Sequence, residues 1–151
     1  MLFRTLTVTA LLASAGFAAD HMMGTWKMNP AKSKYTGAPA PKEYSMTFTP
    51  EGTGWRYVGK GVAADGKPIN MSFVYVKDGE EIKITGFAYA DAMTIKDGHA
   101  DTGTSVMMQG GKQVGTLKRS ISKDGKVLTI SANYAYPDGK KMSYTSIYEK
   151  Q

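Results

Sequence analysis

The 151-residue chain contains no cysteine and only two histidines. Without cysteine it can form neither a disulfide nor a lipid-modified cysteine, and it has no thiolate for catalysis or zinc binding. The sequence also lacks a Gly-x-Ser-x-Gly element, a P-loop and histidines at the spacing of a zinc site. We therefore expect a protein that is not an enzyme and that needs no cofactor and no metal.

Apolar runs long enough for a confident membrane span are also missing. The one sustained apolar stretch, residues 5–15, follows Arg4 and is followed by the small residues Gly16 and Ala18. This pattern predicts a secretory signal peptide over residues 1–18, and a retained amphipathic anchor is the alternative. We expect one mature domain over residues 19–151, periplasmic or secreted, with no integral membrane span after processing.

The net charge of the chain is modest, at +6 for 19 basic and 13 acidic side chains. Removal of a signal peptide would delete only Arg4 and leave the charge clearly positive. The lysines are scattered among acidic turn residues, which favours solubility and argues against a nucleic-acid-binding stripe. We expect a monomer that does not bind nucleic acid.

Turn signals and alternating apolar residues divide the mature sequence into short strands. Asp-Gly pairs suit tight hairpins because Gly accepts a positive φ without a Cβ clash. Between the turns, apolar and polar residues alternate, which is typical of half-buried strands. The predicted strands are residues 22–28, 44–49, 54–62, 69–77, 80–86, 92–96, 99–108, 112–122, 126–134 and 140–149.

The strand pattern predicts an all-β fold. A long meander removes its exposed edges most simply by closing into an up-and-down antiparallel β-barrel, here of about 8–10 strands. A two-sheet sandwich is the competing architecture. Residues 29–43 contain Pro30, Pro39 and Pro41, so we expect an ordered loop across one barrel end, anchored by Tyr35, with a mobile linker as the alternative.

Several segments of the chain resemble known proteins. Gly24-Thr25-Trp26 at the first strand, the meander and the late Arg119 together resemble the lipocalin-like barrels of the calycin superfamily. A closer resemblance, to a largely uncharacterised group of small exported bacterial lipocalin-like proteins, rests on the segments 24–34, 38–42, 63–68, 121–126 and 148–150.

The resemblance implies that Gly24, Trp26 and Arg119 close one end of the barrel, with Arg119 packed over the Trp26 ring. It supplies no activity. The sequence departs from fatty-acid-binding proteins because three prolines oppose a helical lid between the first strands. It also departs from classical lipocalins, because the chain ends in a strand-like run instead of a helix.

Arg119 shares its strand parity with Leu117 and Ile121, so it should point inward with them. A buried guanidinium without a partner costs several kcal/mol. A cation–π contact with Trp26 is the structural interpretation, and an anionic ligand group such as a carboxylate is the functional one.

The predicted interior is rich in methionine and aromatic residues, which suit a pocket that adapts to apolar ligands. An ordinary packed core is the alternative. Inward tyrosine hydroxyls then need one another, water or a ligand as partners. The candidate ligand-binding residues are Met46, Phe48, Tyr57, Met71, Phe73, Tyr75, Met93, Arg119, Met142 and Tyr144.

These observations predict an exported protein that binds or carries a small apolar or amphiphilic molecule. The alternative is a protein-interaction module with a filled barrel and no ligand, and a continuous void of several hundred Å3 would discriminate between the two.

Two metal hypotheses remain open beside these functions. His99 is a candidate haem ligand if it points inward, against a solvated turn histidine. A processed Ala19-Asp20-His21 terminus has the spacing of a Cu(II) or Ni(II) site, against a frayed terminus without function.

Overall fold

The computed structural model of the protein describes residues 20–151, so the predicted signal peptide and Ala19 lie outside the described residues. Within residues 20–151, no helix combines the length and apolarity needed to cross a membrane. The elements are β1 (Gly24–Met28), a 3-10 helix η1 (Pro30–Lys32), β2 (Lys34–Thr36), β3 (Glu43–Glu51), β4 (Gly54–Val62), β5 (Pro68–Tyr75), β6 (Ile82–Lys83), β7 (Ala92–Lys96), β8 (Thr102–Gln109), β9 (Lys112–Ile121), β10 (Val127–Ala135) and β11 (Lys141–Lys150).

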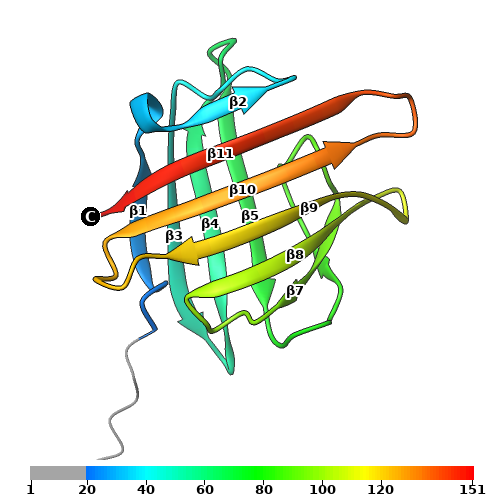
Figure 1. Cartoon of the computed structure of the whole chain (residues 1–151). Coiled ribbons are helices and arrows are strands. Elements are labelled where there is room, and N and C mark those ends of the chain that lie inside the picture. The colour runs from blue at the N-terminus through cyan, green and yellow to red at the C-terminus, as the bar shows by residue number, and fades with distance from the viewer. Residues whose placement is uncertain (1–19) are drawn as a thin grey trace, which may run out of the picture.

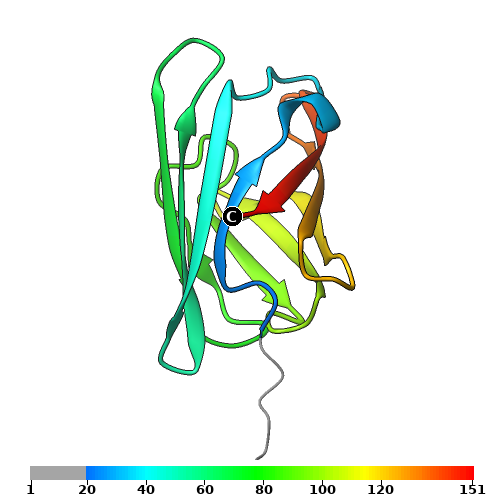
Figure 2. The same cartoon turned by 90° about the vertical axis from the view of Figure 1, so that its left-hand side faces the viewer.

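The strands form one antiparallel meander that curls into a nearly closed barrel. β3 to β5 and β6 to β11 each pair with their sequence neighbours, and β1 pairs with both β3 and β11. Figures 1 and 2 show β3, β4 and β5 on one side of the molecule and β7 to β11 crossing them on the other. The all-β up-and-down barrel predicted from the sequence is thereby confirmed.

The barrel closes at a seam between β5 and the segment that follows β6, where a single isolated bridge joins the two. Ser72 and Thr85 form the bridge there, each donating its amide N–H to the carbonyl oxygen of the other at 3.0 Å. Gly86 follows with a φ of +77°, and a Cβ atom on it would lie 1.7 Å from the Asn70 carbonyl oxygen. The seam therefore stays tight because Gly86 has no side chain.

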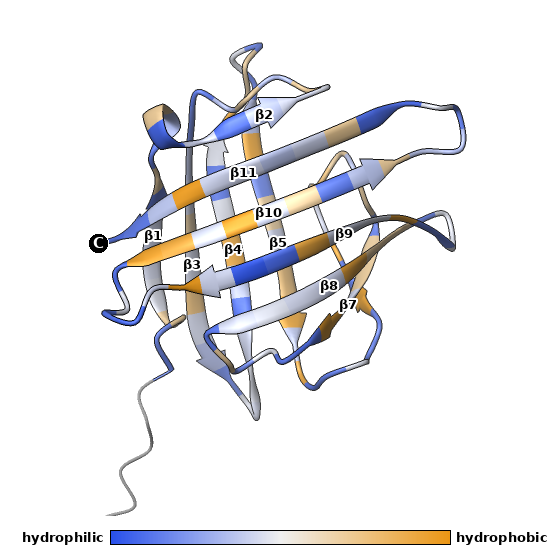
Figure 3. Cartoon of the chain, viewed as in Figure 1, coloured by the Kyte–Doolittle hydropathy of each residue, from blue (hydrophilic) through white to orange (hydrophobic). Residues whose placement is uncertain are grey.

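Alternation along the strands places the apolar side chains inside. Hydrophobic and hydrophilic residues succeed one another along β10 and β11 in Figure 3. In β10 the inward set is Leu128, Ile130, Ala132 and Tyr134, and Leu128, Ala132 and Tyr134 are fully or almost fully buried. The period of two in the sequence thus determines which residues face the interior.

The loop of residues 29–43 is ordered and contains two short elements that the sequence did not predict. The Asn29 side chain accepts a hydrogen bond from the Lys32 amide and caps η1. β2 then pairs with β11, and the Tyr35 ring stacks on Tyr144 with centroids 5.2 Å apart. Tyr35 is therefore an anchor, as expected, and a mobile linker is not what the structure shows.

We predict that Gly86→Ala destabilises the barrel more than Gly79→Ala. Both glycines have a φ of +77°, but a Cβ at Gly79 would meet nothing within 4 Å. The left-handed backbone costs each alanine about 1–2 kcal/mol, and the clash at Gly86 adds about 1–3 kcal/mol. Urea unfolding of the two variants measures the difference. Equal losses would mean that the seam does not depend on Gly86.

Candidate functional site: the barrel interior

The barrel contains a partly open cavity of about 400 Å3. Nine of the ten predicted ligand-binding residues line it, and Tyr75 does not. Eleven lining residues are aromatic: Tyr35, Tyr44, Phe48, Trp55, Tyr57, Phe73, Phe87, Tyr89, Tyr134, Tyr144 and Tyr148. The volume lies within the range of small-molecule sites, and the barrel is therefore not filled by its own side chains.

The cavity walls differ in character. β3, β4 and β5 contribute the rings of Phe48, Tyr57 and Phe73, and the last two are stacked with centroids 4.6 Å apart and planes at 13°. Across the cavity, β8 contributes the small residues Gly103 and Ser105. The rings of one wall therefore face a strand whose lining includes two small residues beside the larger Met107.

One end of the cavity is bordered by loops with small or rigid apolar residues. The proline-rich segment supplies Ala38, Pro39 and Pro41, and the segment after β6 supplies Phe87 and Tyr89. The sequence predicted that the proline-rich loop crosses a barrel end, and the structure confirms this placement. The segment after β6 was missed, although its Phe and Tyr could have indicated a lining role.

The opposite end is closed around Trp26, which is fully buried and does not line the cavity. Its Nε1 donates to the Met22 carbonyl oxygen at 2.9 Å. The cation over the ring is the Lys150 ammonium, 5.1 Å from the centroid, because Lys150 pairs directly with Trp26 across β1 and β11. The structure thus gives Lys150 the cation–π contact that the sequence analysis assigned to Arg119.

Gly24, the third predicted barrel-closing residue, begins β1 with a φ of +111°. A Cβ atom built on it would lie 3.3 Å from the Cε atom of Lys150. The glycine therefore leaves room for the lysine that covers Trp26, and both residues belong to the closed end.

Arg119 is buried and lines the cavity, but its partners are backbone carbonyls. Its Nη2 donates to the Asp97 and Ala100 oxygens of the β7–β8 turn, at 3.0 and 2.8 Å. Burial lowers the pKa of Arg119, and the nearby carboxylates, Asp20 first among them, act in the opposite direction. Its Nε is buried without a partner. The guanidinium thus holds the turn and has a buried donor without a partner at Nε.

Tyr75 has the inward parity that the sequence indicated, yet it lies in the closed end below the cavity. Its ring stacks on Trp55, with centroids 4.8 Å apart, and its hydroxyl donates to Asp78 at 2.7 Å. Asp78 also accepts the amides of Asp97 and Gly98. Tyr75 therefore supports the same β7–β8 turn as Arg119 does and does not line the cavity.

Two tyrosine hydroxyls in the cavity wall pair with each other. Those of Tyr44 and Tyr57 lie 2.6 Å apart, at the place where a side chain on Gly59 would otherwise be. Burial raises the pKa of Tyr44 to about 12 and that of Tyr57 well above its ordinary value. Both phenols are therefore neutral at physiological pH.

The Tyr134 hydroxyl is the exception among these phenols, because it is buried without a hydrogen-bond partner. Its ring stacks between those of Tyr136 and Tyr144. Burial raises the pKa of Tyr134 and outweighs a lowering by the nearby Tyr144 hydroxyl, which interacts with the Tyr134 hydroxyl without reaching the distance and angle of a hydrogen bond. The sequence indicated that such hydroxyls need partners, without distinguishing this one.

The two histidines lie outside the cavity, at the closed end. His99 is half exposed, with Nδ1 3.3 Å from Asp20 and Nε2 3.1 Å from the Thr53 carbonyl oxygen. His21 Nδ1 lies 3.1 Å from Asp101. His99 is thus a turn histidine and does not face the interior. No group of three or more His, Asp or Glu side chains within residues 20–151 could hold a metal ion.

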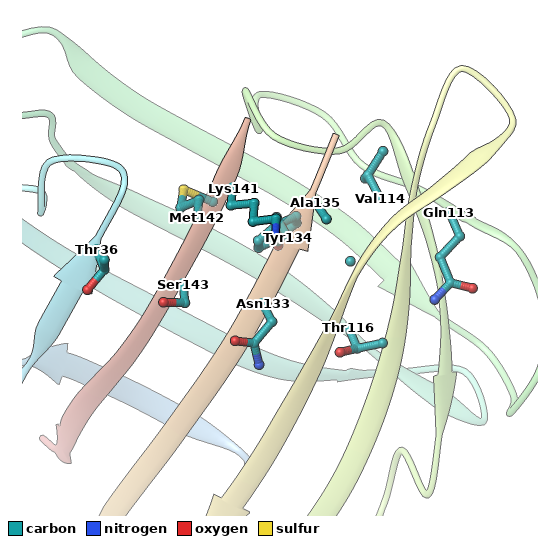
Figure 4. Close-up of a pocket in the computed structure, with 11 residues that line it drawn as sticks. Thr36, Gln113, Val114, Thr116, Asn133, Tyr134, Ala135, Lys141, Met142 and Ser143 are labelled. Carbon is teal, nitrogen blue, oxygen red and sulfur yellow. The ribbon is translucent and has the colours of Figure 1, made fainter. Parts of the chain in front are cut away.

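A second hollow, of about 570 Å3, is an open groove on the outside of the barrel. Figure 4 shows its lining side chains, which come from β2, β9, β10 and β11. Thr36, Ser143, Asn133 and Thr116 pair in register across these strands. Although its volume is larger, the groove is more open and its lining mixes polar side chains with apolar ones such as Val114 and Met142. The barrel cavity, with its predominantly aromatic and apolar lining, is the better candidate for binding an apolar molecule.

No protein-family model and no curated protein sequence matches the chain. Among solved structures, the chain is similar to the zebrafish ileal bile acid-binding protein complexed with cholic acid, at 12% identity and a TM-score of 0.43, over 87% of this chain and 99% of that one. It is also similar to the siderocalin Ex-FABP, at 12% identity and a TM-score of 0.38, over 87% of this chain and 74% of that one. Both likenesses are too distant for a ligand to be carried over.

We predict that the protein unfolds at alkaline pH through its buried tyrosines. Burial raises the pKa of Tyr44, Tyr57, Tyr144 and Tyr148 above the ordinary value near 10. Above that value the unfolded chain loses protons that the folded chain retains, so stability present below about pH 10 falls as the pH rises. Each buried tyrosine contributes up to about 1.4 kcal/mol per pH unit.

Urea unfolding at a series of pH values, with tyrosinate absorbance recorded in parallel, checks this slope. Tyr148→Phe should reduce the slope of unfolding free energy against pH by the contribution of one tyrosine. Tyrosinate formation in the folded state near pH 10 would contradict the prediction.

We also predict that Arg119→Met lowers the free energy of unfolding by about 2–4 kcal/mol, because two carbonyls of the β7–β8 turn lose a charged donor. Arg56→Met is the matched control. Arg56 makes an exposed ion pair with Glu51, at 2.7 Å, and its loss should cost less than about 1 kcal/mol. Chemical denaturation compares the two variants, and similar losses would show that Arg119 does not hold the turn.

Proposed function

We propose that the protein binds or carries a small apolar or amphiphilic molecule in its barrel. The observation that carries this proposal is the cavity of about 400 Å3 inside the barrel, with eleven aromatic lining residues. Burying a ligand against these rings gains roughly 25 cal/mol per Å2 of apolar surface. The polar lining, made of tyrosine hydroxyls, Ser105 and Arg119, would orient the ligand and does not suggest a reaction.

The cavity also bears on the alternative, an interaction module with a filled barrel. That alternative requires side chains to occupy the interior, whereas the rings of Phe48, Tyr57 and Phe73 cover one wall without filling the space. The void is of the size that favours ligand binding over a filled barrel. We therefore place the function inside the barrel.

The proposal includes export as a monomer to the periplasm or outside the cell. Its support is the sequence of residues 1–18, with Arg4 ahead of a short apolar run and small residues at the expected cleavage point. A barrel without cysteine needs no disulfide formation in either redox environment. Mass spectrometry of the protein from its own host would test the cut after Ala18.

Binding is testable with anilinonaphthalene sulfonate, an amphiphilic dye that fluoresces in apolar surroundings. We predict that Ser105→Phe weakens dye binding at least about tenfold, because the new ring occupies the cavity that Ser105 lines. Thr104→Phe is the matched control, since the neighbouring residue of β8 faces outward and is exposed.

Fluorescence titration of the folded variants measures the dissociation constants, and circular dichroism verifies folding. The control should bind the dye as the unmodified protein does. Equal affinity of Ser105→Phe and Thr104→Phe would place the dye outside the barrel and contradict the proposed function.

A further inference from the structure

The cavity contains two buried donors without partners, and they come from neighbouring strands. These are Nε of Arg119 in β9 and the hydroxyl of Tyr134 in β10. The side chains are nearly inaccessible, at 7% and 3% exposure, and both residues line the cavity. An unsatisfied buried polar group destabilises the free protein, so each donor indicates a place where a ligand atom could accept a hydrogen bond.

The strand register places the two donors at different levels of the cavity. Arg119 pairs with Ile130, and Tyr134 pairs with Gly115, so their positions differ by four residues along the strands. At about 3.3 Å per residue, this corresponds to about 13 Å between backbone levels. Arg119 reaches toward the closed end, whereas Tyr134 lies beside the ring of Phe87 near the loops. One ligand that meets both donors must be elongated.

The electrostatics around Arg119 favour a neutral acceptor. Its Nη2 is already bonded to two carbonyls. A guanidinium binds a carboxylate bidentately through Nε with Nη2 or through Nη1 with Nη2, so neither pair is free, and the buried donor without a partner is Nε–H. The carboxylates of Asp20, Asp78 and Asp101 lie near enough to offset the guanidinium charge. One carbonyl oxygen satisfies the remaining donor without a further negative charge.

The rings of the wall formed by β3, β4 and β5 favour an aromatic ligand, which can pair with their edges or faces. The Tyr57 and Phe73 rings are nearly parallel, and Phe48 meets Tyr57 edge to face at 5.3 Å. Stacked and edge-to-face ring pairs contribute about 0.5–1.5 kcal/mol beyond the area they bury. A flexible alkyl chain would gain the burial but not this contribution.

We propose that the cavity binds an elongated, planar molecule that carries a hydrogen-bond acceptor of the carbonyl type near each end. This proposal rests on the proposed function and specifies its ligand class. Arg119 Nε–H donates to the acceptor at the closed end, Tyr134 O–H donates to the other, and the rings of β3 to β5 pack against the body. The absence of cysteine leaves no thiol to react with an electrophilic carbonyl compound.

The test uses two probes of the same shape, 4,4′-diacetylbiphenyl and 4,4′-diethylbiphenyl, of which only the first has carbonyl acceptors. Each displaces anilinonaphthalene sulfonate from the unmodified protein and from Tyr134→Phe. We expect the variant to bind the diketone about threefold to tenfold more weakly, and the hydrocarbon equally well, because it loses one hydrogen bond. The variant without ligand should be at least as stable as the unmodified protein, since it loses an unsatisfied hydroxyl.

Tyr136→Phe is the matched control. It follows directly after β10, does not line the cavity, and donates its hydroxyl to the Tyr89 carbonyl oxygen at 3.0 Å. This variant should lose stability and keep its affinity for both probes, which is the reverse of the pattern expected for Tyr134→Phe.

The outcomes separate the two proposals. If Tyr134→Phe loses affinity equally for both probes, or for neither, the proposed hydrogen bond from Tyr134 to a ligand acceptor is overturned. Binding in the cavity would remain intact. Lower stability of unliganded Tyr134→Phe shows that the hydroxyl has a partner in the free protein and also overturns it. If neither biphenyl nor the dye binds the unmodified protein, the proposed function itself fails.

Discussion

The structure depends on β1, whose five residues pair with both β3 and β11 and so join the two ends of the meander. Trp26 stands opposite Met46 on one side and Lys150 on the other. A slip of one residue would turn Trp26 outward, so this pairing sets the inward face of its neighbours as well. The barrel circumference that results is wide enough that the inward rings line the space without filling it.

Different kinds of interaction hold the two ends of the barrel. At the closed end, Trp55, Asp78 and Arg119 bond to backbone atoms of the β7–β8 turn, so a buried guanidinium is compensated by carbonyl dipoles. At the other end, ring stacking that includes Tyr35 and Tyr144 joins β2 to β11. Polar contacts with directional geometry hold the closed end rigid, whereas stacked rings can slide to accommodate a ligand.

The sequence predicted the strands well because hairpin turns and a period of two are local signals. Residues 54–62 and 92–96 agree with β4 and β7 to the residue. The partners of Arg119 were not predictable, because backbone carbonyls of a distant turn have no signature in residue types. Tyr75 shows a related limit: parity tells which face a side chain is on, but not how far along the barrel the cavity extends.

The interior is not arranged for stability alone. Phenylalanine at position 134 would keep the ring stacking of Tyr134 and remove an unsatisfied hydroxyl, which costs about 1–3 kcal/mol where it is buried. The small residues of the opposite wall could likewise be larger, although Gly103 is restricted by the Arg119 guanidinium. A buried hydrogen-bond donor without a partner, in a cavity lined by aromatic rings, is inconsistent with a filled core. Such local inconsistencies concentrate at functional sites. The interior is therefore better explained by an absent acceptor than by imperfect packing.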